Sequence, residues 1–278
     1  MSRIDTHQHF WAFAPEKYPW IDWKMAPLRR DFGPADLEPE LRAAGIDGTL
    51  LVEARGHLEE TENLLRIARE TPFVRGVVGW LPLAEPGIEA LLEHMAHAPL
   101  CGVRHWMGAA DDASYMSSSA LHHGVGLLQR FGLSYDLMLW PPQLASAAGF
   151  VDRHPEQHFV LDHFAKPYVA RQELEAWRRD LRELARRPNV YCKVSGLATE
   201  ANWESWAPSD LQPYLDAALE AFSPRRLMFG SDWPVCTLAT TYRRWADTIA
   251  TWAEALSVSE RDRLFGETAI EAYRLKRS

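Results

Sequence analysis

Cysteine is scarce in this chain of 278 residues, which has only Cys101, Cys192 and Cys236. None of the three forms a Cys-x-x-Cys pair, and an odd count leaves one without a partner. The spacing therefore excludes a disulfide framework. It predicts reduced thiols that serve as packing residues, as expected of a cytoplasmic protein.

Long apolar runs and an excess of positive charge are missing too. No apolar run reaches the length of a membrane span, and residues 1–5 lack the apolar stretch of a signal peptide. Thirty basic and 38 acidic residues give a net charge of -8. This balance argues against nucleic acid or an anionic membrane as the main partner. No low-complexity linker or composition break divides the chain, so we expect one domain over residues 1–278.

Short apolar runs alternate regularly with longer amphipathic stretches. The runs expected as strands are Ile4–His9, Gly48–Ala54, Val74–Trp80, Leu100–His105, Leu133–Leu139, His158–His163, Asn189–Ser195 and Arg226–Ser231. Helical patterns are expected at Pro34–Ala44, Leu58–Glu70, Pro86–His97, Ser118–Arg130, Pro142–Arg153, Ala170–Arg187, Ser209–Phe222 and Thr240–Glu254, with one closing helix at Ser259–Leu275. Eight strand-then-helix units predict an α/β fold, a (β/α)8 TIM barrel. The alternative is a doubly wound open sheet, but no GxGxxG or Walker motif follows any strand.

Ionisable side chains stand at nearly every expected strand end, where the active sites of such barrels lie. These side chains are His7, His9, Glu53, Arg55, Arg104, His105, Asp136, Asp162, His163, Lys166, Lys193 and Asp232. His7 and His9 are two residues apart on one strand, so both point to the same face. If the barrel forms, these two histidines converge with His163 and Asp232 at one mouth.

Asp232 follows the apolar run Leu227–Phe229 and precedes Pro234, which ends strand pairing. A carboxylate at the mouth of a buried strand is costly unless a metal, a cation or catalysis uses it. The other interpretation is that Asp232 caps a helix or loop.

The chain resembles the amidohydrolase superfamily, and most closely its branch of sugar-acid lactonases of the L-fuconolactonase and L-rhamnonolactonase type. Pyrone-dicarboxylate lactonases are more distant relatives. The matching segments are Ile4–Trp11, Gly102–His105, Leu161–Pro167, Cys192–Leu197 and Phe229–Pro234. The resemblance spans nearly the whole chain. It implies a hydrolase that opens a sugar-acid lactone, with Asp232 as the general base and His7, His9 and His163 stabilising the oxyanion.

Departures from the superfamily pattern bear on the metal. Dinuclear members carry a bridging Lys or Glu on strand four and a His on strand five, whereas this chain has Arg104, His105 and Asp136 there. The resemblance therefore implies at most one weakly held divalent ion, such as zinc, on His7, His9, His163 and Asp232, with Glu53 as a further candidate ligand. Members of the lactonase branch that need no metal make such an ion dispensable.

The expected substrate contacts are Trp11, Glu53, Arg55, Arg104, His105, Asp136, Lys166 and Trp233. Their mixed charges suit a neutral sugar lactone better than a dicarboxylate. Glu53 could instead pair with Arg55 or Arg104, and Lys166 and Lys193 could pair with Asp162 and Asp136.

The aromatic segment of residues 10–33 either covers the barrel mouth or packs against the outer helices, and residues 197–208 are expected to form a second piece of the cover. The alternative functions are a metal-dependent decarboxylase and a pyrone-dicarboxylate lactonase. We expect a small-molecule substrate and a monomer or small homo-oligomer.

Overall fold

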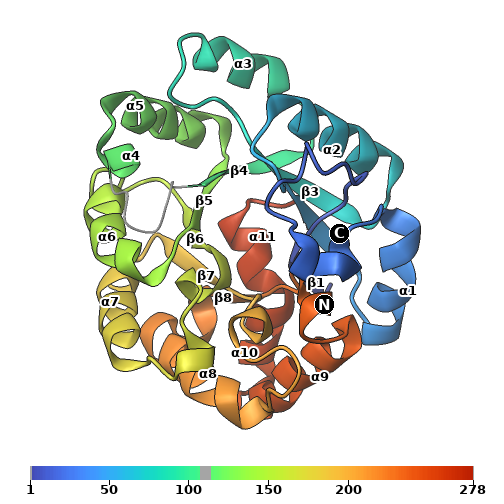
Figure 1. The fold of residues 1–278 in the computed structure, drawn as a ribbon. Helices are drawn as coiled ribbons and strands as arrows, with labels where there is room; N and C mark the ends of the chain where they lie inside the picture. The colour runs from blue at the N-terminus through green and yellow to red at the C-terminus, as the bar shows by residue number, and fades with distance from the viewer. Residues whose placement is uncertain (1, 107–113, 278) are drawn as a thin grey trace.

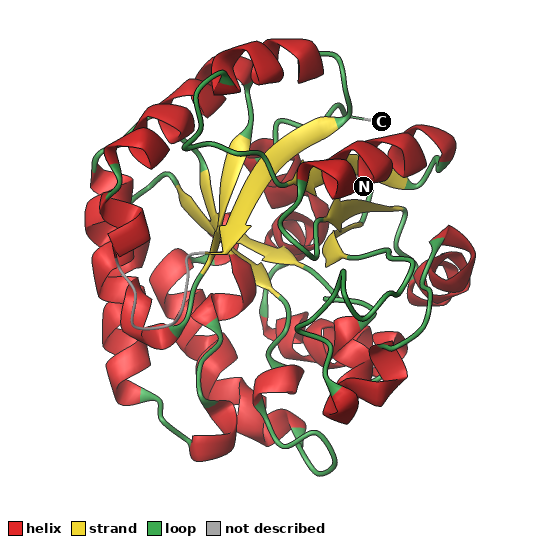
Figure 2. Ribbon diagram, turned by 45° about the horizontal axis from the view of Figure 1, so that its top comes forward, coloured by secondary structure: helices red, strands yellow, loops and turns green. Residues whose placement is uncertain are grey.

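Eight parallel strands form a nearly closed barrel with helices around it (Figures 1 and 2). The structure is a computed structural model that describes residues 2–106 and 114–277. The strands are β1 Ile4–Gln8, β2 Gly48–Val52, β3 Val74–Gly79, β4 Leu100–Trp106, β5 Ser134–Met138, β6 Phe159–Leu161, β7 Val190–Val194 and β8 Leu227–Phe229. Each strand pairs with the next in sequence. The fold predicted from the strand-helix alternation is confirmed.

The first and last strands close the barrel through the residues that follow them. The amide of Asp232 donates to the carbonyl of His7 at 2.7 Å, and the amide of His9 donates to the carbonyl of Trp233 at 2.8 Å. The Asp5 carboxylate on β1 also accepts the amide of Ser231, at 2.8 Å. These bonds bring the end of β8 directly beside the end of β1.

Helices occupy the connections between strands. They are α1 Pro34–Ala44, α2 Leu58–Glu70, α3 Ile88–Met95, α4 Ser114–Ser117, α5 Ser119–Leu128, α6 Leu144–Asp152, α7 Glu175–Ala185, α8 Pro208–Phe222, α9 Tyr242–Trp252, α10 Val258–Asp262 and α11 Thr268–Ala272. The expected bounds of α1 and α2 are confirmed, and most others are shorter than expected. Among the described residues, no helix combines the length and the apolar character needed to cross a membrane.

The closing helix expected at Ser259–Leu275 is present as one continuous helical run from Val258 to Ala272, which contains a π-helical turn that the sequence did not predict. A π-helical turn, Arg263–Glu267, separates α10 from α11. Gly266 in this turn lies against the N-terminal segment so closely that a Cβ there would be 2.2 Å from the Ser2 carbonyl oxygen. The absence of a side chain at Gly266 therefore lets the turn pack directly on the backbone before β1.

Successive side chains of each strand point alternately into the barrel and toward the outer helices, so the apolar residues form an inner and an outer cluster. Leu50 and Val52 of β2 belong to the inner cluster, with Tyr273 just after α11, whereas Leu51 packs with the outer helices. The Tyr273 hydroxyl donates to Asp136 inside the barrel at 2.7 Å. The lower barrel is thus filled, and open space remains at the C-terminal ends of the strands.

The aromatic segment over residues 10–33 both packs and covers. Trp11 and Phe32 pair through two backbone hydrogen bonds, and their rings pack edge to face. Tyr18 is buried beside Trp11 and donates its hydroxyl to Glu60 at 3.3 Å. Trp20, by contrast, lines a cavity at the barrel mouth. Trp11 and Tyr18 of this segment therefore pack against the protein, whereas Trp20 covers the barrel mouth.

Glu60 on α2 is expected to make folding stability depend on pH. Burial, and next the charge of Glu53, raises its pKa from 4.5 to about 6. Since the folded state holds this proton more tightly than the unfolded state, stability falls as pH rises from about 4.5 through 6, by about 2 kcal/mol. Glu60→Gln removes this loss and keeps an oxygen acceptor for the amides of Ala54 and Arg55, which Glu60 now accepts.

Urea unfolding at pH 4.5 and pH 7.5 measures the effect. The free energy of unfolding of Glu60→Gln, relative to that of wild type, should be about 2 kcal/mol higher at pH 7.5 than at pH 4.5. Glu59→Gln, at the exposed neighbouring position, is the control and should show no such gain. If the stability of Glu60→Gln differed from that of wild type by the same amount at both pH values, the raised pKa of Glu60 would be contradicted.

Candidate active site

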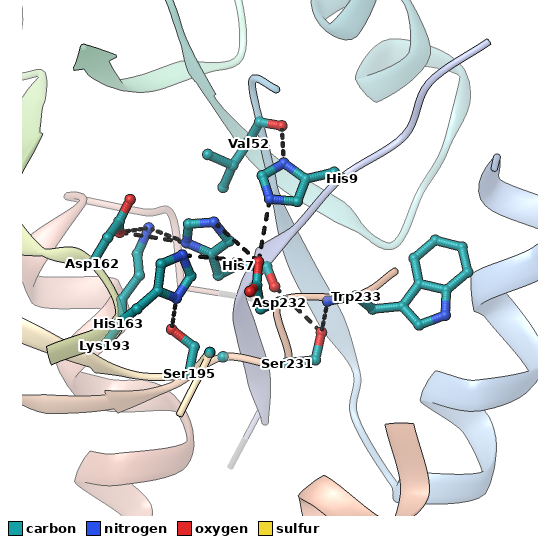
Figure 3. A network of polar contacts seen from close by, with 12 residues as sticks. His7, His9, Val52, Asp162, His163, Lys193, Ser195, Ser231, Asp232 and Trp233 are labelled. Carbon is teal, nitrogen blue, oxygen red and sulfur yellow. Dashed lines mark hydrogen bonds and ion pairs between the residues drawn. The ribbon is translucent and has the colours of Figure 1, made fainter. Parts of the chain in front are cut away.

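Four side chains from three strand ends meet at the barrel mouth (Figure 3). Oδ1 of Asp232, after β8, lies 3.4 Å from Nε2 of His9 and 3.8 Å from Nε2 of both His7 and His163. All four side chains are buried. We call His7, His9, His163 and Asp232 the histidine–aspartate cluster. The sequence predicted that these four residues converge, although His7 and Asp232 are 225 residues apart in the chain. The structure brings them together.

Hydrogen bonds behind the rings orient two of the histidines. His9 Nδ1 lies 2.8 Å from the carbonyl oxygen of Val52, which can only accept, so Nδ1 carries a proton and the Nε2 edge of the ring is turned toward Asp232. His163 Nδ1 lies 2.8 Å from the Ser195 hydroxyl. Burial lowers the pKa of His163 to about 4, so its ring is neutral at pH 7.

His7 lies between two cations. Its Nε2 is 3.2 Å from Nη1 of Arg104, and its Nδ1 is 3.1 Å from Nζ of Lys193 and 3.4 Å from Oδ1 of Asp162. Burial, and next the Lys193 charge, lowers the pKa of His7 well below its ordinary value. The ring is therefore neutral, and Nδ1–H facing Asp162 leaves Nε2 as the acceptor for Arg104.

Asp232 is ionised in this setting. Burial alone would raise its pKa, but the facing imidazoles, His163 first, bring it well below the ordinary value. Its backbone is left-handed, with φ of 58°. This conformation is rarely adopted by residues other than glycine and is often found at functional sites.

The chain after β6 makes an unusual turn that aims two side chains. Four consecutive residues are left-handed, with φ of 50°, 55°, 58° and 50° for His163, Phe164, Ala165 and Lys166. Each such residue costs about 1–2 kcal/mol. The indole of Trp177 donates to the Phe164 carbonyl at 2.7 Å and holds the turn. β6 therefore ends at Leu161, not at His163 as expected, and both His163 and Lys166 face the barrel mouth.

Beneath the cluster lies a network of buried ion pairs. Arg104 bonds Glu53 at 2.7 Å and Asp162 at 3.1 Å. Lys193 bonds Asp136 at 2.6 Å and Asp162 at 3.0 Å. The expected pairs Glu53–Arg104 and Lys193 with the two aspartates are confirmed. Lys166 does not pair with an aspartate of this network: it bonds Glu200, at 2.9 Å.

The cluster opens into a cavity of about 260 Å³. The residues that line it are His9, Trp20, Met25, Ala54, Arg104, Trp106, Met138, Trp140, His163, Lys166, Thr199, Glu200, Trp203, Asp232, Val235 and Leu238. Indole rings thus line the same cavity as His9, His163 and Asp232. This wall combines flat apolar surfaces with a few polar groups, which suits a small polyol ring.

Several expected substrate contacts lie elsewhere. Trp233 is buried against Phe10 and Phe32, and Figure 3 shows its ring pointing away from the cluster. Trp11 is buried in the aromatic segment, and His105 is packed between Trp80 and Tyr135. These rings are fully occupied by protein packing, so we no longer expect them to contact substrate.

The charged residues among the expected contacts divide in the same way. Glu53 and Asp136 lie in the buried ion-pair network, and Arg55 bonds Glu59 at 2.6 Å beside a neighbouring cavity. Arg104 and Lys166 line the cavity itself. These two cations remain the expected charged contacts.

Comparison with known proteins agrees with this geometry. The family model described as amidohydrolase matches residues 4–275. The chain belongs to the amidohydrolase family. This amidohydrolase is 41% identical over 284 aligned residues to the L-fucono-1,5-lactonase of Burkholderia multivorans, covering 98% of this chain and 96% of that protein. The L-fucono-1,5-lactonase of Burkholderia ambifaria is 36% identical, with 99% and 96% covered.

A solved structure shows the same fold. The crystal structure of an amidohydrolase from Burkholderia multivorans with bound zinc is 40% identical and superposes with a TM-score of 0.95, covering 99% of this chain and 100% of that one. A second crystal structure of an amidohydrolase from that organism, with bound HEPES, has a TM-score of 0.96. The barrel of this amidohydrolase therefore matches that of a family member crystallised with a divalent metal.

The histidine–aspartate cluster has donors that fit one small divalent ion. Ligand atoms of His7, His9 and Asp232 lie within 4.8 Å of one another. Zinc takes donors at about 2.0–2.2 Å, so two donors of one ion lie roughly 3.3–3.6 Å apart. The separations of 3.4 and 3.8 Å from Asp232 Oδ1 are close to this range. The Arg104 guanidinium beside His7 Nε2 opposes a second positive charge there.

Sequence reasoning missed the partners that shape this site. Ser195 orients His163, Glu200 pairs with Lys166, and Trp20, Trp140 and Trp203 form the apolar wall. A partial signal existed for two of these rings, since Trp20 and Trp203 lie in the segments expected to cover the mouth. No comparable signal marks Glu200, which becomes a partner only through the left-handed turn.

Gly196 is expected to be essential for the position of His163. Its φ is 65°, and a Cβ there would lie 2.6 Å from Nδ1 of His163. Gly196→Ala must therefore push the imidazole off Ser195 and strain the backbone, at about 1–2 kcal/mol of folding stability. We expect a fall of at least about tenfold in kcat, since misplacement by an ångström can cost about a hundredfold.

Thermal unfolding and steady-state kinetics test this expectation. Gly126→Ala on α5 is the matched control, because nothing lies within 4 Å of the added methyl group. That helix substitution should leave both measurements unchanged or raise stability slightly. Wild-type kinetics in Gly196→Ala would show that the position of His163 does not matter.

Proposed function

We propose that this amidohydrolase hydrolyses a sugar-acid lactone of the L-fucono-1,5-lactone type to its aldonic acid. The observation that carries the proposal is the ionised Asp232 facing three histidines at the floor of a cavity walled by tryptophans. The two Burkholderia L-fucono-1,5-lactonases, similar along nearly the full chain, support the same chemistry.

Asp232 acts as the general base in the proposed mechanism. A water beside His9 donates a hydrogen bond to Asp232 Oδ1 and directs its lone pair at the lactone carbonyl. As the new C–O bond forms, Asp232 takes the proton. It then returns the proton to the ring oxygen as the ring C–O bond breaks. The product is the open-chain acid, and no other reactant is needed.

The developing oxyanion is stabilised by groups that line the cavity. When the Ser195 hydroxyl donates to His163 Nδ1, His163 presents Nε2–H to the substrate. Arg104 and Lys166 add fixed positive charge. Each such donor contributes on the order of 10²–10³-fold in rate. His7, held between Arg104 and Lys193, stabilises the arrangement of the cluster.

A divalent ion such as zinc, held by His7, His9, His163 and Asp232, would polarise the carbonyl and acidify the attacking water. We propose that this ion is dispensable, because the steps above use only protein groups. A lactone is an activated ester, so one positioned carboxylate can suffice.

The charges of the described cavity residues favour a neutral substrate over a dicarboxylate. Arg104 is already paired with Glu53 and Asp162, and Lys166 with Glu200. A dianion such as a pyrone dicarboxylate needs cations that are free to pair with both carboxylates.

The test is an assay of purified protein against a panel of aldonolactones, with acid release followed by a pH indicator, with and without chelator. We expect fast hydrolysis of L-fucono- and L-galactono-lactones at a rate that chelator does not change. If no lactone reacts, the proposal fails. Bound metal together with turnover of an acidic aromatic substrate would then identify a decarboxylase.

A further inference from the structure

The Arg104 side chain occupies an unusual place next to the donors of the histidine–aspartate cluster. It comes from the end of β4 and is 4% exposed. Its Nε bonds the Glu53 carboxylate at 2.7 Å, and its Nη2 donates to the Glu53 carbonyl. These two anchors fix the remaining nitrogen, Nη1, between Asp162 and Nε2 of His7.

The nitrogen that Arg104 contacts is also a candidate metal donor. His7 Nε2 belongs to the set formed with His9 and Asp232, and it has one lone pair. At 3.2 Å from Nη1, that lone pair accepts a hydrogen bond from a permanently charged guanidinium. A divalent ion would need the same lone pair and would lie within a few ångströms of the guanidinium charge, where repulsion is strong.

We infer that Arg104 is the built-in cation of this site, which supplies the positive charge that a divalent ion would supply and keeps such an ion weakly bound. Arg104 also lines the cavity, so its positive charge acts on a substrate carbonyl bound there. This inference rests on the proposed function for its kinetic consequence, but its consequence for metal binding does not.

The charge of Lys193 reinforces the arrangement. Its ammonium lies 3.1 Å from the other nitrogen of His7, so this ring has a cation at each edge. Lys193 is itself bonded to two aspartates, whereas Arg104 contacts a nitrogen of the donor set directly and also lines the cavity. Arg104 is therefore the residue to change.

Zinc binding to chelator-stripped protein, measured by calorimetry with zinc chloride, tests the inference. We expect wild type to bind zinc weakly and Arg104→Met to bind one equivalent on the order of a hundredfold more tightly. Arg104→Lys keeps a cation and should stay close to wild type. Arg226→Met removes a half-buried arginine that bonds carbonyl groups at the other end of the barrel, and it should not change zinc affinity.

A second variant guards against misfolding of Arg104→Met, which leaves Glu53 without its partner. The double variant Arg104→Met/Glu53→Gln removes both members of the pair, which is less damaging than removing one. It should bind zinc like Arg104→Met, and zinc should raise its melting temperature but not that of wild type.

Kinetics provide the second readout. Without metal, Arg104→Met should lose about 10²–10³-fold in kcat/KM, and wild type should respond neither to zinc nor to chelator. Tight, stoichiometric zinc on wild type would overturn the inference, as would variants that bind zinc no better than wild type. If zinc affinity changes as expected but no lactone reacts, only the proposed function fails. If lactones react but zinc affinity does not change, only this inference fails.

Discussion

Replacing Asp232 with asparagine is expected to lower kcat/KM for lactone hydrolysis by about 10³–10⁴-fold, since the amide cannot accept the proton of the attacking water. The amide has nearly the same shape as the carboxylate and fits the same space among the imidazoles that lie 3.4 and 3.8 Å from Oδ1. The fold should therefore persist. Removal of a buried charge at a functional site often leaves stability unchanged or raises it.

The measurement is steady-state hydrolysis of the lactone that wild type prefers, with circular dichroism and thermal unfolding to verify the fold. Asp247→Asn is the matched control: it removes an exposed aspartate on α9 that pairs only with Arg243 in this structure's ion pairs. Its kinetics should equal wild type. Residual activity above about a tenth in Asp232→Asn is incompatible with a proton-transfer role.

Replacing Lys193 with methionine is expected to destabilise the fold by about 3–5 kcal/mol. The ammonium is completely buried and bonds Asp136 at 2.6 Å and Asp162 at 3.0 Å. Methionine fills a similar volume but leaves both carboxylates inside the barrel with less positive charge. Breaking a buried pair in this way costs far more than breaking an exposed one.

Urea unfolding at pH 7 measures this loss. The exposed pair Arg243–Asp247 provides the control, and Arg243→Met should cost less than about 1 kcal/mol. The double variant Lys193→Met/Asp136→Asn should recover part of the stability, because it removes one of the carboxylates that lost its partner. A loss below about 1 kcal/mol for Lys193→Met would mean that the network does not depend on its lysine.

The sequence predicted which residues stand at the barrel mouth, because strand period and strand order determine it. His7 and His9 share a face through their spacing, and His163 and Asp232 follow apolar runs that can only be buried strands. The carboxyl ends of parallel strands meet at one rim, so convergence followed from the fold alone.

The sequence could not predict which charged groups pair across that rim. Lys166 turned from Asp162 to Glu200 because four left-handed residues follow β6, and no residue in that turn is glycine. Trp233 looked like a sugar platform beside Asp232, yet its ring points outward into the aromatic segment. The pairing of Lys166 and the direction of the Trp233 ring depend on left-handed backbone conformations, which a sequence indicates only where it has glycine.

Closure of the barrel by its first and last strands ties the site to the order in which the chain is made. Asp5 on β1 and Ser231 after β8 are 226 residues apart and meet in one hydrogen bond. During synthesis His7 emerges 225 residues before Asp232, so the histidines of β1 stay without their carboxylate until that later part of the chain has emerged. Contacts of such long range form slowly. The rate at which activity returns during refolding would therefore report when β8 joins β1. The circular dichroism of the helices alone would not detect this step.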